Sequence, residues 1–200
     1  MLITIAGMPP SRLTVVAYDI RAPRRARAVR RVLGAVSHAK QYSVYETHLG
    51  PGELRRVLTD VGACCDPKLD RMAAWWPVDG MRLIWSQNGL QTEAQAGGAR
   101  AQPTHLRANI GNFMLCFDIS NAATLRAVSA EIAAESAMVQ RSVYWLRAST
   151  THLTALLTRC NAFLETADRL WAYPLGGSRA LWRVDADTAP SLIPIATHHW

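Results

Sequence analysis

Several signals that commonly assign a protein to a class are missing from this chain of 200 residues. Its four cysteines form no Cys-x-x-Cys pair and have no histidine at the spacing of a zinc site. No hydrophobic run approaches the length of a membrane-spanning helix. The apolar stretch at 1–6 is too short for a signal peptide and has no charged segment before it. We therefore expect a cytoplasmic protein with reduced cysteines and no membrane partner.

Acidic residues are too few to balance the basic ones. The chain has 22 Lys and Arg against 15 Asp and Glu, which gives a net charge of +7. Residues 12–82 hold thirteen of the basic and seven of the acidic residues, whereas 110–183 hold seven and five. The basic surface is thus expected mainly in the first part of the chain, and such a field favours a polyanion.

The chain contains one pattern twice. Val-Ala-Tyr-Asp-Ile at 16–20 returns as Leu-Cys-Phe-Asp-Ile at 115–119, and Gln-Tyr-Ser-Val-Tyr at 41–45 returns as Gln-Arg-Ser-Val-Tyr at 140–144. Both pairs are 99 residues apart. A third echo, Asp-Arg at 70 and again at 168, keeps nearly the same offset. A period of this length indicates two fused globular units rather than a solenoid.

Hydrophobic patterning predicts the same order of elements in each copy. It runs strand, helix, an extended segment with room for two short strands, helix, strand and a short trailing strand. This order predicts an α+β fold of two tandem ferredoxin-like (split βαβ) sandwiches that form an intramolecular pseudo-dimer. The expected parts are a first domain at 12–85, a linker at 86–109, a second domain at 110–184 and a C-terminal tail at 185–200.

Each copy ends its first predicted strand with a single aspartate, Asp19 or Asp118. A pseudo-two-fold axis can bring the two carboxylates together, where they would share a proton or a divalent cation. Mg²⁺ prefers oxygen ligands and keeps several waters, one of which can be activated toward a phosphodiester. Alternatively, each aspartate caps the turn or helix that follows, and both interpretations stay open. No His or Lys recurs beside the aspartates as a general base, so metal binding is favoured over catalysis.

The second candidate site is the first predicted helix. Arg24, Arg27 and Arg31 are three and four residues apart, which places them along one stripe of a helix, with Arg30 at its edge. Such a stripe can contact successive phosphates without reading bases, whereas the ordinary alternative is a solvated helix face. No acidic residue lies among these arginines, so we predict sequence-independent binding of duplex DNA or RNA. The predicted contacts are Arg21, Arg24, Arg25, Arg27, Arg30, Arg31 and Lys40.

The order of these motifs, found twice, is the basis of a family resemblance. Each copy has a first strand that ends in aromatic-Asp-Ile, a Gln-x-Ser-Val-Tyr segment and a closing aromatic-Pro strand. The residues are Tyr18-Asp19-Ile20, Arg24-Arg25, 41–45 and Trp76-Pro77, then Phe117-Asp118-Ile119, 140–144 and Tyr173-Pro174. Together they resemble the CRISPR-associated protein two family over about three quarters of the chain. The helix of the second copy departs from the pattern, because it has only Arg126 beside Glu131 and Glu135.

This resemblance implies a fold, a partner and a site. Members of the family are small ferredoxin-like subunits that partner the CRISPR integrase in acquiring new spacers, usually as homodimers, so this chain resembles a fused dimer. The trailing strand of a member commonly joins the sheet of its partner, a role that falls here on 82–85 and 180–184. Several members are described as metal-dependent endonucleases, and their strand-end aspartates correspond to Asp19 and Asp118, with Mg²⁺ as the expected cofactor.

Three functions from different classes follow. The first is a nucleic-acid-binding adaptor for the CRISPR integrase subunit, with or without nuclease activity. The second is a metal-dependent ribonuclease or deoxyribonuclease, since the sandwich also resembles toxin ribonucleases of the virulence-associated protein D type. That activity would need both aspartates, whereas an adaptor can tolerate their loss. The third is a regulatory module similar to certain transcription repressors. It ranks last, because the chain has no room for the helix-turn-helix domain that such proteins carry.

Overall fold

A computed structural model describes residues 12–41, 43–77, 81–86, 89–94, 110–175, 180–185 and 188–194. The chain forms two compact units, and each unit draws on both halves of the sequence. The first unit contains the residues up to Ala74 together with Arg183–Ser191. The second contains Trp75–Trp182 together with the residues from Leu192 onward.

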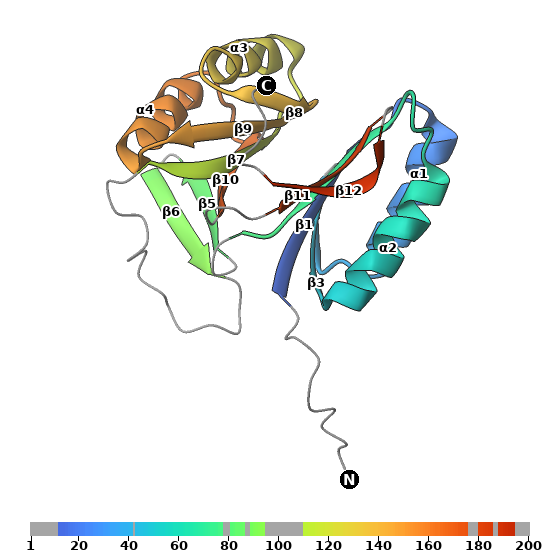
Figure 1. Ribbon diagram of the computed structural model, residues 1–200. Coiled ribbons are helices and arrows are strands. Elements are labelled where there is room, and N and C mark those ends of the chain that lie inside the picture. Colours follow the sequence, from blue (N-terminus) through green and yellow to red (C-terminus); the bar gives the residue numbers. More distant parts are fainter. Residues whose placement is uncertain are drawn as a thin grey trace. The chain divides into compact units, whose positions relative to one another are not determined.

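The first copy of the repeat forms four strands and two helices, as predicted. They are β1 (Arg12–Asp19), α1 (Pro23–Gly34), β2 (Ala39–Gln41), β3 (Val44–Leu49), α2 (Pro51–Cys64) and β4 (Arg71–Trp75). These strands adopt the order β4-β1-β3-β2, and α1 and α2 lie next to each other along the sheet (Figure 1). Pro23 and Pro51 start the two helices, where the missing N–H of proline has no intrahelical acceptor to lose.

The second copy repeats this arrangement. Its elements are β7 (Gly111–Asp118), α3 (Ala122–Ala133), β8 (Ala137–Gln140), β9 (Val143–Ala148), α4 (Thr150–Asn161) and β10 (Arg169–Leu175). The strand order β10-β7-β9-β8 is the same as in the first copy. The antiparallel neighbours β7 and β9 pair with Cys116 opposite Val143. The predicted α+β fold with two ferredoxin-like halves is therefore confirmed.

Each copy gives its trailing hairpin to the sheet of the other copy. The strands are β5 (Met81–Ser86) and β6 (Gly89–Ala94) from the first copy, and β11 (Ala180–Asp185) and β12 (Thr188–Pro194) from the second. β5 pairs with β10, and β11 pairs with β4, so that both sheets have six strands. The trailing strands thus join the opposite sheet, as the family resemblance implied.

Two of these strands lie in the segments predicted to be a linker and a tail. β6 falls within 86–109, and β12 falls within 185–200. β6 reads Gly-Leu-Gln-Thr-Glu-Ala, which lacks the density of β-branched and aromatic residues that marks a strand. Its strand conformation comes from pairing with β5 in a hairpin, and a tertiary effect of this kind leaves a weak sequence signal.

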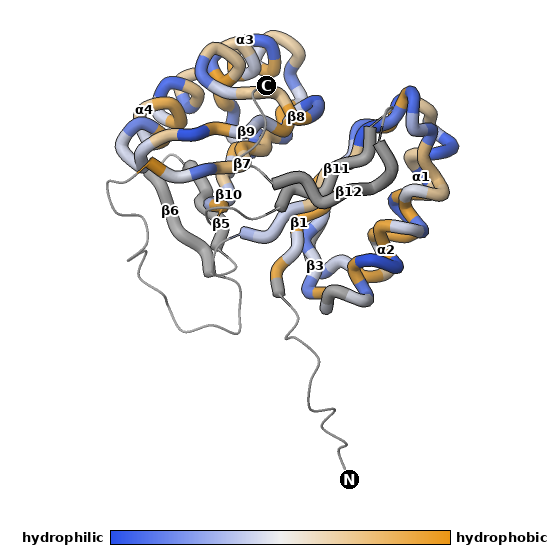
Figure 2. Tube along the Cα trace, in the orientation of Figure 1, coloured by the Kyte–Doolittle hydropathy of each residue, from blue (hydrophilic) through white to orange (hydrophobic). Residues whose placement is uncertain are grey.

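The core of the second unit lies between its sheet and its helices. Leu115 and Phe117 of β7 share one buried cluster with Val128 and Ile132 of α3 and with Leu156 of α4. In Figure 2 the apolar stretches of α3 and α4 alternate with hydrophilic ones, as the helical period requires. Each fully buried side chain of this size contributes about 1.5–3 kcal/mol through the hydrophobic effect.

The opposite face of this sheet is apolar and buried as well. Met114 and Cys116 of β7 are fully buried, as is Tyr173 of β10. The indole Nε1 of Trp171 donates a hydrogen bond of 2.6 Å to the Tyr173 hydroxyl, and the rings of Tyr173 and Trp75 meet edge to face with centroids 5.9 Å apart. Burial on both faces explains why 113–117 is a continuous hydrophobic run rather than an alternating one.

Candidate functional site

The two predicted site aspartates occupy equivalent places. Asp19 is the last residue of β1 and Asp118 is the last residue of β7, and both are half-buried. In each copy, the residue before the aspartate forms a backbone hydrogen bond with the repeated Gln-x-Ser-Val-Tyr segment. The amide of Tyr18 donates to the Ser43 carbonyl at 3.0 Å, and the amide of Phe117 donates to the Ser142 carbonyl at 3.2 Å. The repeated motif therefore has a backbone role, which is to fix the strand end that carries the aspartate.

The helix-capping alternative for these aspartates is wrong. The N-cap of α1 is Ala22, which has no side-chain cap. The N-cap of α3 is Asn121, whose side chain accepts hydrogen bonds from the amides of Ala123 and Thr124. Within the described ranges, neither Asp19 nor Asp118 accepts a hydrogen bond through its carboxylate.

The donor chemistry of these residues fits Mg²⁺. This cation is commonly held by only one or two carboxylates and completes its octahedron with water, and each strand end supplies one carboxylate. The described residues do not, however, form a chelating site in advance of metal binding. Among the residues that the structure describes, no three His, Cys, Asp or Glu side chains group together in a way that could hold a metal ion.

A second pair of equivalent aspartates has a structural role that the sequence analysis did not assign. The Asp70 side chain is fully buried and receives Arg25 through Nε at 2.6 Å and Nη2 at 3.2 Å. Its Oδ2 also accepts the Asp66 amide at 2.9 Å. Among the described residues, its counterpart Asp168 accepts backbone amides alone, those of Glu165 at 2.9 Å and Ser120 at 3.4 Å. The repeated Asp-Arg dipeptide was the available signal for this pair.

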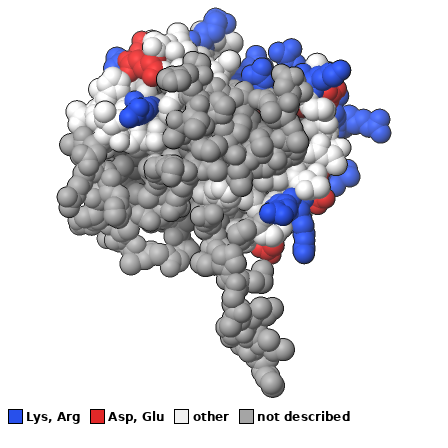
Figure 3. All heavy atoms as spheres, in the orientation of Figure 1, with Lys and Arg blue, Asp and Glu red and all other residues white. Residues whose placement is uncertain are grey.

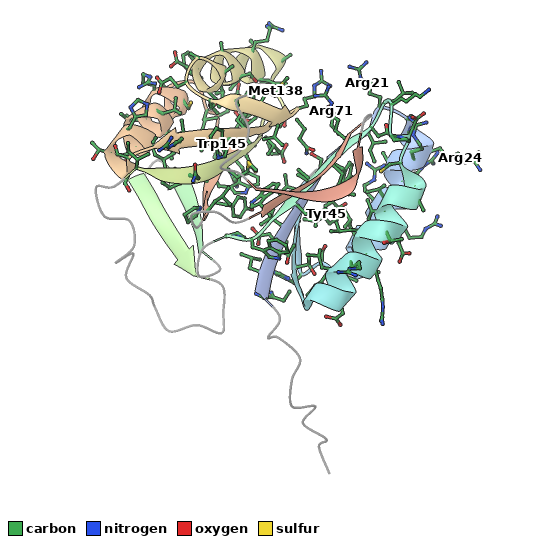
Figure 4. All side chains as sticks on the ribbon, in the orientation of Figure 1. Arg21, Arg24, Tyr45, Arg71, Met138 and Trp145 are labelled. Atoms are coloured by element: carbon green, nitrogen blue, oxygen red, sulfur yellow. The ribbon has the colours of Figure 1, made fainter. Side chains whose placement is uncertain are left out.

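The arginine stripe of α1 faces away from the sheet. Ala26, Val29 and Leu33 form the buried side of the helix, and Arg24, Arg27 and Arg31 are exposed. Figure 4 shows Arg24 extending outward from α1. Arg21, just before the helix, is exposed too. None of these four arginines forms an ion pair with another residue in the described part of the chain, so their guanidinium groups are available to anions.

The three remaining predicted contacts, Arg25, Arg30 and Lys40, differ from these four exposed arginines. Arg25 forms an ion pair with Asp70, so its guanidinium group stabilises the fold and is not free to bind a phosphate. Arg30 is exposed, but its charge acts on the neighbouring hydroxyl of Tyr18. Burial and the neighbouring Tyr45 raise the pKa of the Tyr18 hydroxyl, and Arg30 opposes that rise. Lys40 belongs to β2, but its side chain lies outside the described residues.

Helix α2 extends the basic surface beyond the predicted residues. Arg55 and Arg56 are both exposed. Together α1 and α2 carry seven arginines and only two acidic residues. In Figure 3 the Lys and Arg atoms gather over these two helices. The sequence signal for α2 was a basic dipeptide on the polar side of an amphipathic helix, which is too common a pattern to single out.

The comparison with known families agrees with this geometry. A family model described as CRISPR associated protein Cas2 matches residues 12–75 and 112–180, one match for each copy of the repeat. The chain belongs to this family. The double match also confirms the tandem duplication. Among curated proteins, the search found none that matches the chain.

Membership of the Cas2 family supports a CRISPR-associated role with partners from the CRISPR system. The family is generally metal-dependent. None of the helices in the described ranges is long and apolar enough to cross a membrane.

The second Cas2 copy carries an ion network where the first has free arginines. On α4, Arg159 donates through Nε to Glu131 of α3 at 3.1 Å and also pairs with Glu135. Glu135 in turn lies 2.5 Å from His152 Nε2. This network ties α3 to α4 and pairs Arg159 with Glu131 and Glu135.

Proposed function

We propose that this Cas2 protein is an adaptor that binds duplex nucleic acid for the CRISPR integrase during spacer acquisition. The observation that carries the proposal is the row of exposed, unpaired arginines on α1. Guanidinium groups bind phosphates bidentately, and contacts with phosphates carry no information about base sequence. Such contacts suit a protein that must accept fragments of any sequence. The basic residues of α2 add to the same field.

We further propose that Asp19 and Asp118 bind Mg²⁺ and support hydrolysis of a phosphodiester. Both carboxylates are half-buried and free of partners among the described residues, which supports a ligand role. A bound Mg²⁺ would supply a Lewis acid and an acidified water. The protein would contribute rigid strand ends, because the Tyr18 and Phe117 amides anchor each aspartate to its neighbouring turn. If cleavage is confined to RNA, the alternative of a ribonuclease of the virulence-associated protein D type gains support.

One experiment separates the adaptor from the nuclease. Purified protein is incubated with labelled RNA and with labelled duplex DNA, with and without Mg²⁺, and both binding and cleavage are recorded. The variant is Asp19→Ala/Asp118→Ala, and the matched control is Asp60→Ala/Glu165→Ala, which removes the same charge from exposed positions. Cleavage that needs Mg²⁺ and disappears only in the first variant supports the metal proposal. Binding that survives in both variants without any cleavage leaves the adaptor alone, and absence of binding contradicts the adaptor.

A further inference from the structure

We infer that only the first unit of this duplicated protein contacts the phosphate backbone, so that the chain has one nucleic-acid face and not two equivalent ones. This inference rests on the proposed nucleic-acid binding and adds which half performs it. A homodimer must present the same surface twice. A fused chain is free of that constraint, because its two copies can change independently.

The arginine stripe has no counterpart on the second copy. At the repeat offset of 99 residues, Arg24 and Arg31 correspond to Ala123 and Ala130, and only Arg27 corresponds to another arginine, Arg126. Ala123, Arg126 and Ala130 are all exposed on α3. The difference is therefore at the surface and has no direct consequence for the core.

The ion network removes most of the charge that remains on the second helical face. A phosphate that approached Arg159 would have to displace Glu131 and Glu135 and would be repelled by both. The first copy has Val32 and Val36 at the positions of these two glutamates, so Arg24, Arg27 and Arg31 meet no such competition. The two helical faces have the same arrangement of helices, but only the first carries the stripe of exposed, unpaired arginines.

Salt dependence measures how many phosphates each face contacts. For B-DNA, the logarithm of the binding constant falls with the logarithm of the salt concentration by about 0.9 per neutralised phosphate. Removal of three contacting arginines should lower that slope by about 2 to 3 and weaken binding on the order of tenfold or more. Removal of three arginines that touch no phosphate should leave the slope unchanged.

The test compares two triple variants with equal change in net charge. One is Arg24→Ala/Arg27→Ala/Arg31→Ala in the first unit, and the other is Arg126→Ala/Arg141→Ala/Arg147→Ala, three exposed arginines of the second unit. Fluorescence anisotropy with labelled duplex DNA, over a range of salt concentrations, gives affinity and slope. Circular dichroism and thermal unfolding check that each variant is folded.

A gain-of-binding variant keeps the inference testable even if a triple variant folds poorly. Ala123→Arg/Ala130→Arg rebuilds the stripe around Arg126, and it should steepen the slope by about 1 to 2. A first-unit triple that loses slope and affinity, beside a second-unit triple that binds as wild type does, supports the inference. Equal losses in both triples overturn it but leave the proposed function standing. If the wild type does not bind duplex, both are overturned.

Discussion

The contact between Arg25 and Asp70 allows a sharp test of how buried aspartates stabilise this fold. Asp70 and Asp168 stand at equivalent positions just before β4 and β10, and both are buried. Asp70 has a guanidinium partner at 2.6 Å, whereas Asp168 has backbone amides only. Substitution of aspartate by asparagine therefore breaks an ion pair at position 70, whereas at position 168 it removes a charge that only hydrogen bonds from backbone amides stabilise.

The expected magnitudes follow from these contacts. Asp70→Asn keeps an oxygen acceptor but ends a bidentate ion pair, and disruption of a buried pair costs about 3–5 kcal/mol. Because the Arg25 side chain is 31% exposed and water screens part of the attraction, we expect about 2 kcal/mol. Asp168→Asn loses no counter-charge, so we expect about 1 kcal/mol. Arg25→Ala leaves the buried Asp70 carboxylate without its counter-charge and should destabilise the fold more than Asp70→Asn does.

Urea denaturation followed by circular dichroism measures these free energies. The double variant Arg25→Ala/Asp70→Asn completes a thermodynamic cycle, and its loss should be clearly smaller than the sum of the two single losses. Equal losses for Asp70→Asn and Asp168→Asn, or additive losses in the cycle, would show that the guanidinium contributes nothing to the fold. Arg25 would then return to the group of arginines available for phosphates.

Three further predictions concern other parts of the fold. Burial raises the pKa of Cys160 from 9.0 to about 12, so the folded state keeps the thiol proton at pH values where the unfolded state loses it. Cys160 should therefore lower stability by about 2 kcal/mol from pH 9 to pH 10.5, and Cys160→Ala should make the fall measured by urea denaturation smaller by that amount. Ser142 has φ 65°, in the left-handed region, so Ser142→Gly should be neutral or stabilise by up to about 1 kcal/mol in thermal unfolding, and a clear loss would contradict this. Deletion of 180–200 should expose the edge of β4 and lower the unfolding temperature of the first unit. The amide hydrogens of β1 and β4 should then exchange faster with solvent, and an unchanged rate would contradict the pairing of β11 with β4.

The element order of both halves could be predicted because each copy carries strong local signals. The continuous hydrophobic run of β7 and the arginine-rich α1, which begins at a proline, are examples. The exchanged hairpins could not be predicted from local patterns. β6 is short of β-branched and aromatic residues, and the pairing of β5 with β10 joins residues such as Trp85 and Leu170 that are far apart in the sequence. Only the family resemblance pointed to that exchange.

The candidate site was predictable in composition but not in the division of roles. Six clustered arginines predict a basic surface, yet periodicity alone cannot separate Arg25, which binds Asp70, from Arg24, which is free. That distinction depends on a residue 45 positions away in the chain. The structural role of Asp70 was hidden for the same reason, since a buried ion pair leaves no signal in the local sequence around either partner.

The comparison between the two copies separates what the fold needs from what a partner needs. Both copies keep the strand-end aspartate, the turn whose serine carbonyl fixes it, and the buried aspartate before the last strand. The first of these has no partner among the described residues and caps no helix, so folding alone does not account for its presence twice. The arginine stripe occurs once, at exposed positions that the fold leaves unconstrained. The proposed metal binding at each strand end and the proposed phosphate contact of one helical face account for this pattern, because the first acts on both copies and the second on one.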